Sequence, residues 1–556
     1  MRSLGHWSLL SSLRLLLLVC VVAGAARVYV AAEKPLNYDE YWHIFVAQQD
    51  TREGLAREWR SNAHPPLYYW LLRLLVSLAR GPVVDRSISL LAGVLAVLVI
   101  GQILAKVAKD PVVAPLGAFA FALAPSAVLI SSEVRSYMLC TLFLLVAFSQ
   151  YVGLVKGPPS FRALVIFSGA SCLALMSHYF TIFFLAAGLA AAVWMAATRL
   201  SAGEGPGGLD RWGGAALAAA LPILGVATFL YRDHLRGMAG PQKHLSAFYY
   251  HPESGESVLH YVIGATWNAF NLFAPVAVGT SGAVAVFALC LALLVGALIY
   301  LSQLRRRARS VVRDLPLLFL VLLVTTLLAA SVKGAYPFGG DLRQQFILFP
   351  FLLLTAFSLL DSMLSWRPRL RRPLIAIVLL GVCLNSGLGL ARISPHKEGG
   401  GFEDMFAREM SLHRAAFPEA GAVYLGQFSL IVYFAHHDRW RWKTVDANTY
   451  EITRGGRKVV VMRDERLRWN LDVLDAMLYE DLGRRLESLR LRSTTVFSLR
   501  YPFPPEPWTS TERDAVRLEV PALAARAHLE TDRLLLDGFN AFAQFRIREA
   551  AAGSTR

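Results

Sequence analysis

Residues 12–43 read SLRLLLLVCVVAGAARVYVAAEKPLNYDEYWH, an apolar run followed by a segment rich in acids and aromatic side chains. A helix needs roughly 20 mostly apolar residues to cross a bilayer, because unpaired backbone groups are too costly in hydrocarbon. The first run covers 12–32, and similar runs recur near 86–106, 111–131, 136–155, 161–177, 179–198, 214–231, 277–301, 315–332, 344–361 and 373–391. The sequence therefore predicts a polytopic α-helical membrane protein with about eleven spans.

The composition supports this interpretation and divides the chain into two parts. The 556 residues are 55% hydrophobic and 17% charged, whereas soluble proteins average about 45–50% and about 25%. The long apolar runs end near residue 392, so we expect a transmembrane domain over 1–392 and a soluble domain over 393–556. Strand-like runs at 422–426, 458–462 and 494–499, with a helix-like stretch at 471–489, predict that the second domain is of the α/β class.

The first span has an alternative interpretation as a cleavable signal peptide, since Arg2 and Arg14 precede a leucine run. Its apolar stretch extends past the usual signal core, which favours a span that is retained. The five cysteines (Cys20, Cys140, Cys172, Cys290 and Cys383) all fall within expected spans. We therefore interpret them as small apolar residues without disulfide or metal-binding roles.

The net charge of +16 is concentrated in short loops between the spans, such as Arg305–Arg307 and Arg367–Arg372. Loops rich in Lys and Arg face the cytoplasm and its anionic lipids, so this charge does not indicate nucleic-acid binding. With a cytoplasmic N-terminus, the alternate loops 33–85, 131–136, 232–276 and 333–343 lie outside, as do the region near 178 and the C-terminal domain. We expect an inner or plasma membrane protein whose chemistry lies on the periplasmic or exterior side.

The first outer loop opens with two adjacent acids, Asp39 and Glu40, directly after the first span. The structural interpretation is that Asp39 caps a helix at the interface and that Glu40 favours its positive end. Capping needs only one such residue, so the pair is also a candidate for general-base catalysis.

The same loop continues as His64-Pro65-Pro66-Leu67-Tyr68-Tyr69-Trp70. Two prolines fix an extended backbone and hold His64 at the boundary of an aromatic-rich helix. An interfacial aromatic belt accounts for Tyr68 and its neighbours. It does not account for the His-Pro-Pro sequence.

Three later outer segments carry ionisable groups. Glu133 and Arg135 lie in Ser131–Tyr137 and form either an exposed salt bridge of little value or part of a phosphate site. His178 interrupts apolar sequence and is either functional or a hydrogen-bonded structural histidine. Arg343 stands at the start of the tenth span, where it either extends to the lipid headgroups or binds a lipid phosphate.

The order of these motifs closely resembles the pattern of one family. The motifs are the Asp-Glu pair, His-Pro-Pro-Leu-Tyr-Tyr-Trp, Glu-x-Arg-x-Tyr, His-Tyr and a late Arg. The chain resembles GT-C fold glycosyltransferases over roughly residues 10–392, in particular the bacterial branch similar to protein O-mannosyltransferases and lipid A aminoarabinose transferases. In the aminoarabinose branch the position of His64 is often Lys.

The resemblance implies a donor sugar carried on a dolichyl- or undecaprenyl-type phosphate. It implies that an acid in the first outer loop is the base, with Asp39 at the matching position and Glu40 as the alternative. From the residue chemistry, we expect Arg343, Arg135 and His64 to contact the donor phosphate, and Glu133, His178, Tyr68 and Tyr137 to line the substrate pocket. A carboxylate that accepts the proton of the acceptor hydroxyl favours single displacement with inversion.

Two other functions compete with this hypothesis. A ligase or polymerase of lipid-linked glycans also has many spans and outer-loop Arg and His residues, but the acid pair with His-Pro-Pro is not expected there. A secondary transporter keeps charges near the midplane and often has repeated halves. Here the charges gather on one side. The sugar, hexose or pentose, and the acceptor, which is a glycan, a lipid or a protein, stay open; no sequence pattern indicates a metal.

Overall fold

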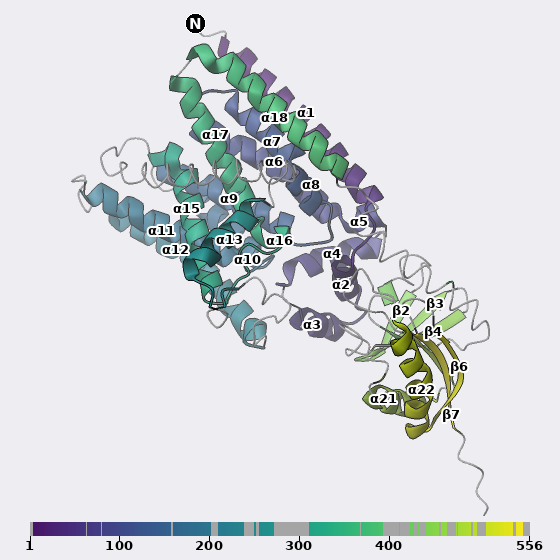
Figure 1. Cartoon of the computed structure of the whole chain (residues 1–556). Coiled ribbons are helices and arrows are strands. Elements are labelled where there is room, and N and C mark those ends of the chain that lie inside the picture. The colour runs from purple at the N-terminus through teal and green to yellow at the C-terminus, as the bar shows by residue number, and fades with distance from the viewer. Residues whose placement is uncertain are drawn as a thin grey trace, which may run out of the picture. The chain divides into compact units, whose positions relative to one another are not determined.

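The computed structural model divides the chain into two compact units (Figure 1). The first comprises Met1–Glu33, Trp59–Leu71 and Asp85–Ser394, and the second comprises Lys34–Glu58, Leu72–Val84 and Pro395–Arg556. The second unit thus includes parts of the segment between α1 and α6 as well as the C-terminal region. The residues that the structure describes are 4–62, 64–78, 81–156, 160–201, 209–237, 249–251, 255–271, 311–366, 368–392, 411, 423–426, 431–432, 441–454, 457–463, 474, 476–490, 493–497, 508–536 and 541–548.

The first unit is helical. Its elements are α1 (Leu4–Glu33), α6 (Ser87–Val107), α7 (Val113–Leu123), α8 (Pro125–Ser131), α9 (Tyr137–Lys156), α10 (Phe161–Leu175), α11 (Thr181–Ser201), α12 (Leu209–Asp233), η2 (Leu235–Gly237), α13 (Val258–Asn271), α15 (Val311–Val332), α16 (Leu342–Gln345), α17 (Leu348–Trp366), η5 (Pro368–Leu370) and α18 (Arg371–Arg392). Helix α9 packs against α6 and α10, and α15 packs against α11 and α17.

The apolar helices make the chain a multi-pass membrane protein. Within the described residues, six helices are long and apolar enough to cross a membrane, or seven if α7 and α8 form one bent span. All the expected spans coincide with helices except 277–301, which lies outside the described residues. Helix α10 is shorter than a full span at 15 residues, so the total of about eleven crossings stays a prediction.

The bend of 59° between α7 and α8 has a local cause. Pro125 begins α8 and has no N–H to continue the ladder of α7. The buried side chain of Arg27 compensates, since its Nη1 donates to the carbonyl of Ala122 at 2.7 Å and its Nε donates to Ser131 Oγ at 3.1 Å. Gly93 leaves room for this arrangement, because a Cβ there would lie 2.7 Å from Arg27 Nε.

The cysteines of the described residues, Cys20, Cys140, Cys172 and Cys383, are free thiols within helices. Cys290 lies outside the described residues.

The second unit contains a mixed seven-stranded sheet with the order β2-β3-β4-β1-β5-β7-β6. Its strands are β1 (Val423–Gly426), β2 (Arg441–Asp446), β3 (Thr449–Arg454), β4 (Arg457–Arg463), β5 (Ser493–Phe497), β6 (Leu529–Leu536) and β7 (Ala541–Ile547). Strand β1 pairs in parallel with β4 and β5, and the other pairings are antiparallel. The three strands expected from the sequence are β1, β4 and β5, and they form the centre of the sheet.

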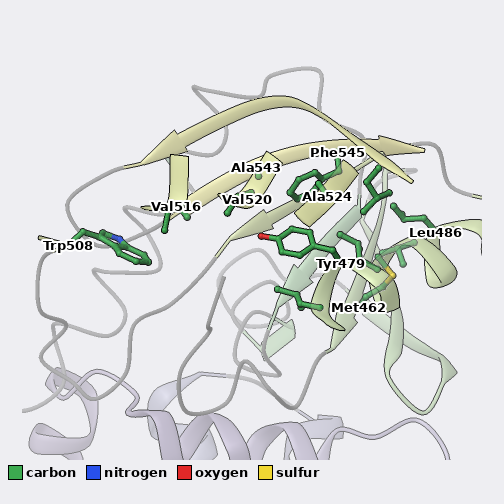
Figure 2. Packing of buried hydrophobic residues seen from close by; sticks show 14 residues of the cluster. Met462, Tyr479, Leu486, Trp508, Val516, Val520, Ala524, Ala543 and Phe545 are labelled. Carbon is green, nitrogen blue, oxygen red and sulfur yellow. The ribbon is translucent and has the colours of Figure 1, made fainter. Parts of the chain in front are cut away.

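Two helices, α21 (Ala476–Ser488) and α22 (Ser510–Arg526), cover the sheet (Figure 1). Leu478, Leu482 and Leu486 are buried at helical spacing along α21. All three belong to one buried cluster, in which Figure 2 labels Leu486, Tyr479 and Phe545. The rings of Tyr479 and Phe545 meet edge to face, with their centres 5.6 Å apart. The predicted α/β class is therefore confirmed for this part of the chain.

The remaining helices lie between α1 and α6. They are α2 (Tyr38–Ala47), α3 (Arg52–Arg60), α4 (Leu67–Leu78) and α5 (Pro82–Asp85). Helix α2 belongs wholly to the second unit, whereas α3 and α4 are divided between the two units.

Candidate active site

The turn between α8 and α9 holds two of the predicted charges inside the first unit. Glu133 is 2% exposed and Arg135 is 6% exposed. The backbone N–H of Arg135 donates to the carbonyl of Glu133 at 2.8 Å, which closes a tight turn. The expectation of an exposed salt bridge is therefore wrong, because both side chains are buried.

Glu133 forms an ion pair with Arg343, which lies 210 positions later in the sequence. Arg343 Nε is 3.2 Å from Glu133 Oε2, and Nη2 donates to Oε1 at 3.4 Å. The two contacts together give the forked geometry that suits a guanidinium and a carboxylate. The Arg343 side chain is 23% exposed, and its Nε also lies 3.8 Å from Asp341 Oδ2.

The loop before Arg343 is closely fitted. Asp341 and Gln344 form a capping box at the start of α16, and Gln345 Nε2 donates to the carbonyl of Pro337 at 2.9 Å. Gly339 has φ +82° and approaches α13 so closely that a Cβ would lie 2.6 Å from the carbonyl oxygen of Ala265. These contacts fix the backbone from which Arg343 projects.

A second group surrounds Arg135. Arg135 Nη1 is 3.4 Å from His64 Nε2, so the guanidinium donates and that ring nitrogen accepts. The His64 ring lies 5.1 Å from the His178 ring and 5.8 Å from the Tyr137 ring, and Tyr137 lies 4.8 Å from His178. Four predicted residues from three separate segments therefore form one cluster.

Tyr68 joins this cluster through a hydrogen-bonded serine. Ser89 Oγ donates to the carbonyl of Arg135 at 2.9 Å, and the Tyr68 hydroxyl lies 3.3 Å from Ser89 Oγ. Since Ser89 uses its proton toward the carbonyl, Tyr68 donates to Ser89. Tyr68 thereby supports the backbone of the buried turn.

His178 is buried and electrically neutral. Its Nδ1 accepts the backbone N–H of Phe180 at 3.1 Å, which places the proton on Nε2. Burial, and secondly the positive charge of Arg135, lower the pKa of His178 to about 3. His178 is thus a hydrogen-bonded histidine that lies against the charged cluster, so its structural and functional interpretations are compatible.

The first-loop acids belong to the second unit and differ in their surroundings. Asn37 is the N-cap of α2: its side chain accepts from the N–H of Glu40, and the Glu40 carboxylate accepts from the N–H of Asn37. The expectation that Asp39 caps this helix is wrong, because Asn37 and Glu40 form a complete capping box. Glu40 is fully buried, whereas Asp39 is half-buried.

The structure also reveals a site residue that the sequence did not indicate. His234, at the end of α12, is 1% exposed. Its Nε2 donates to the carbonyl of Asn62 at 2.5 Å, and its Nδ1 accepts from the Tyr179 hydroxyl. Asn62 Nδ2 in turn donates to the Tyr69 hydroxyl at 2.6 Å. Burial lowers the pKa of His234, so it is a neutral link between the segment that precedes His64 and the start of α11. The sequence signal that could have indicated His234 is its position as an ionisable residue directly after an apolar helix.

The described residues contain no group of three or more His, Cys, Asp or Glu side chains arranged to hold a metal ion.

Comparison with solved structures identifies the fold. Multiple apolar helices, followed by a small sheet domain, give the GT-C architecture expected from the sequence. The structure is similar to that of apo ArnT from Cupriavidus metallidurans, with a TM-score of 0.56 and 13% sequence identity. The match covers 95% of this chain and 97% of that chain. The same coverage and identity, with a TM-score of 0.53, hold for that protein bound to undecaprenyl phosphate.

Archaeal oligosaccharyltransferase AglB from Archaeoglobus fulgidus also matches, in a complex with an inhibitory peptide and a dolichol-phosphate. It has a TM-score of 0.41 and 13% identity over 86% of this chain and 69% of that chain. No protein-family model and no curated protein matches the sequence. The chain is therefore similar in fold to GT-C glycosyltransferases while its sequence is distant from theirs.

Proposed function

We propose that this chain is a glycosyltransferase that moves a sugar, a hexose or a pentose, from a polyprenyl-phosphate carrier onto an acceptor hydroxyl. Two observations carry the proposal: the Arg135–His64 contact and the Glu133–Arg343 ion pair, which start from the same buried turn. They occur in a GT-C fold shared with a protein solved with undecaprenyl phosphate bound. The positive-inside distribution of the loops supports a site on the periplasmic or exterior side, with the 393–556 domain on the same side.

The leaving group in this reaction is a phosphate that is already ionised, so it requires neutralising charge rather than an acid. Arg343 supplies a guanidinium that is held by Glu133, on a side chain that is 23% exposed. Arg135 supplies a second positive charge, and His64, whose Nε2 accepts from Arg135, has its proton on Nδ1 and is able to donate one hydrogen bond. Charges fixed in advance stabilise the developing phosphate without reorganisation at the moment of reaction.

Asp39 is the proposed general base. The Glu40 carboxylate is buried and accepts the N–H of Asn37, so it has a structural role at the start of α2. Asp39 occupies the first turn of the same helix and is half-buried. A carboxylate that removes the acceptor proton as the bond to the anomeric carbon forms typically contributes about 10²–10⁴-fold. Direct attack by the acceptor inverts the anomeric centre.

Glu133, His178, Tyr68 and Tyr137 are the proposed lining of the substrate pocket. The support is that all four lie in or beside the cluster around Arg135 and are buried. The neutral His178 offers an Nε2 proton to a sugar hydroxyl.

The test compares two acid variants that differ in their expected structural cost. The protein is reconstituted in vesicles with a lipid extract and an envelope extract from its own cells. Mass spectrometry follows the loss of polyprenyl-phosphate sugar and the appearance of polyprenyl phosphate. We expect Asp39→Asn to lower the rate at least 100-fold, while Glu40→Gln stays within about threefold because glutamine also closes a capping box.

The opposite ranking, in which Glu40→Gln is inactive and Asp39→Asn is active, would assign the base to Glu40. No conversion by the wild-type protein would reject the transferase function itself. The extract contains the natural sugar and acceptor, so the experiment does not depend on knowing either beforehand.

A further inference from the structure

Helix α2, which carries Asp39, has only ten residues and is buried along nearly its whole length. Its contacts within the second unit are made with the C-terminal sheet. The Phe45 ring lies 5.5 Å from the Tyr450 ring, edge to face, and 6.0 Å from the Trp442 ring. A helix of this length is marginal in isolation, so the sheet determines its orientation.

Arg463, the last residue of β4, contacts the first-loop helices from the sheet. Its Nη1 lies 2.7 Å from Glu58 Oε2, and both side chains are almost fully buried, at 5% and 3% exposure. Its guanidinium carbon lies 5.4 Å from the centre of the Trp42 ring and 5.1 Å from that of Phe45. One cation therefore joins an acid of α3 to two aromatic side chains of α2.

The backbone of Arg463 is also fixed. Its N–H donates to the carbonyl of Asn448 at 2.6 Å, and its carbonyl accepts Arg485 Nη1 at 2.8 Å. The guanidinium thus projects from a rigid strand end that is held on both sides. A buried ion pair contributes little net stability compared with apolar residues of similar size. Its best-attested use is to select one arrangement among several, and a catalytic helix requires one fixed orientation.

We infer that Arg463 is a positioning residue for glycosyl transfer, because it fixes the rotation of helix α2 and with it the direction of Asp39. This inference rests on the proposed role of Asp39 as base. Trp42 follows Asp39 by three residues and so lies on the adjacent turn of the same face. A carboxylate is roughly 5 Å from the helix axis, so a rotation of about 10° moves it by about 1 Å. Misplacement by that distance costs about 10²-fold in rate.

The experiment uses the full chain in vesicles and compares Arg463→Met, the double variant Arg463→Met/Glu58→Gln, and Asp39→Asn. Arg484→Met is the control, since Arg484 is an exposed arginine of the same domain whose side chain pairs with Asp481. Two quantities are measured: the maximal rate of polyprenyl-phosphate sugar consumption, and binding of undecaprenyl phosphate by native mass spectrometry. We expect Arg463→Met to lower the maximal rate at least tenfold and to change undecaprenyl phosphate binding less than twofold.

The double variant separates positioning from stability. It removes the acid together with the cation, so no buried charge is left without its partner. We expect it to regain the thermal-unfolding midpoint of the wild type while its maximal rate stays at least tenfold low. It also carries the test if Arg463→Met alone does not fold.

The outcomes distinguish this inference from the proposed function. Wild-type rates in the double variant, with Asp39→Asn inactive, would overturn the positioning role alone. Equal loss of rate and of undecaprenyl phosphate binding would also overturn it, since that pattern indicates general disruption. Full activity of Asp39→Asn would overturn the base assignment and this inference with it.

Discussion

Gly339 provides the sharpest test of how the loop before α16 sets the place of Arg343. A Cβ at this position would lie 2.6 Å from the carbonyl oxygen of Ala265, whereas ordinary contacts begin at 3.4 Å. Gly339→Ala therefore requires the loop to move by about 0.8 Å. The backbone at φ +82° adds strain of about 1–2 kcal/mol for any residue with a Cβ. With about 1–3 kcal/mol for overpacking, the expected destabilisation is about 2–5 kcal/mol.

Gly334 is the matched control in the same loop. It also has a positive φ, +67°, but no atom lies within 4 Å of a Cβ placed there. Gly334→Ala should therefore lower the free energy of unfolding only by the backbone strain of about 1–2 kcal/mol. The difference between the two variants isolates the close approach to α13.

The assay measures undecaprenyl phosphate binding by native mass spectrometry, together with the thermal-unfolding midpoint. A charge-assisted hydrogen bond contributes about 1.5–3 kcal/mol, so displacement of Arg343 should weaken binding by about 10- to 100-fold in Gly339→Ala. Gly334→Ala should bind within about twofold of the wild type, because its strain is not transmitted by a clash. Equal losses in both variants would refute the reasoning.

Three further perturbations follow from the charged cluster and the helix cap. Lowering the pH from about 6.5 to about 3 should progressively lower the thermal-unfolding midpoint, because His178 stays neutral in the folded protein but takes up a proton when the protein unfolds. His178→Asn should make this decline of the midpoint with pH less steep. Arg343→Ala should lower undecaprenyl phosphate affinity by about 10- to 100-fold. Arg343→Ala/Glu133→Gln should recover thermal stability but not affinity, since it removes the buried carboxylate together with its arginine. Affinity that returns with stability would argue against a phosphate contact. Asn37→Ala should destabilise by about 1 kcal/mol through loss of the cap, as measured by thermal unfolding.

The length of the apolar runs predicted most of the helical architecture correctly. The runs that became α1, α6, α9, α15 and α17 are long and apolar, so length and hydropathy were sufficient to place them. The bend between α7 and α8 was not anticipated, although Pro125 was visible in the sequence. Its stabilisation depends on Arg27, which is distant in sequence, and such pairings are not encoded in local patterns.

The sheet was only partly predictable. Strands β1 and β4 carry short apolar runs and lie in the middle of the sheet. The outer strands β2, β3, β6 and β7 were missed. Tyr450 and Ile452 in β3 alternate with more exposed neighbours, but this signal is short.

In the candidate site, too, the local sequence selected individual residues but did not predict partners that are distant in sequence. Residue type and loop position selected His64, Arg135, Tyr137 and His178, which lie in one cluster. The partner of Glu133 was not predictable, because the nearby Arg135 is an equally plausible partner in sequence. Likewise, Asn37 gave a weaker signal than the two acids that follow it, yet it caps the helix.

The lipid content of cells that lack this chain tests the central claim most directly. Lipid extraction and mass spectrometry would compare the deletion strain with strains that carry the wild-type chain or Asp39→Asn. We predict that a polyprenyl-phosphate sugar accumulates in the deletion strain, returns to its normal level with the wild-type chain, and stays elevated with Asp39→Asn. Unchanged polyprenyl-phosphate sugars in the deletion strain would contradict the proposed function.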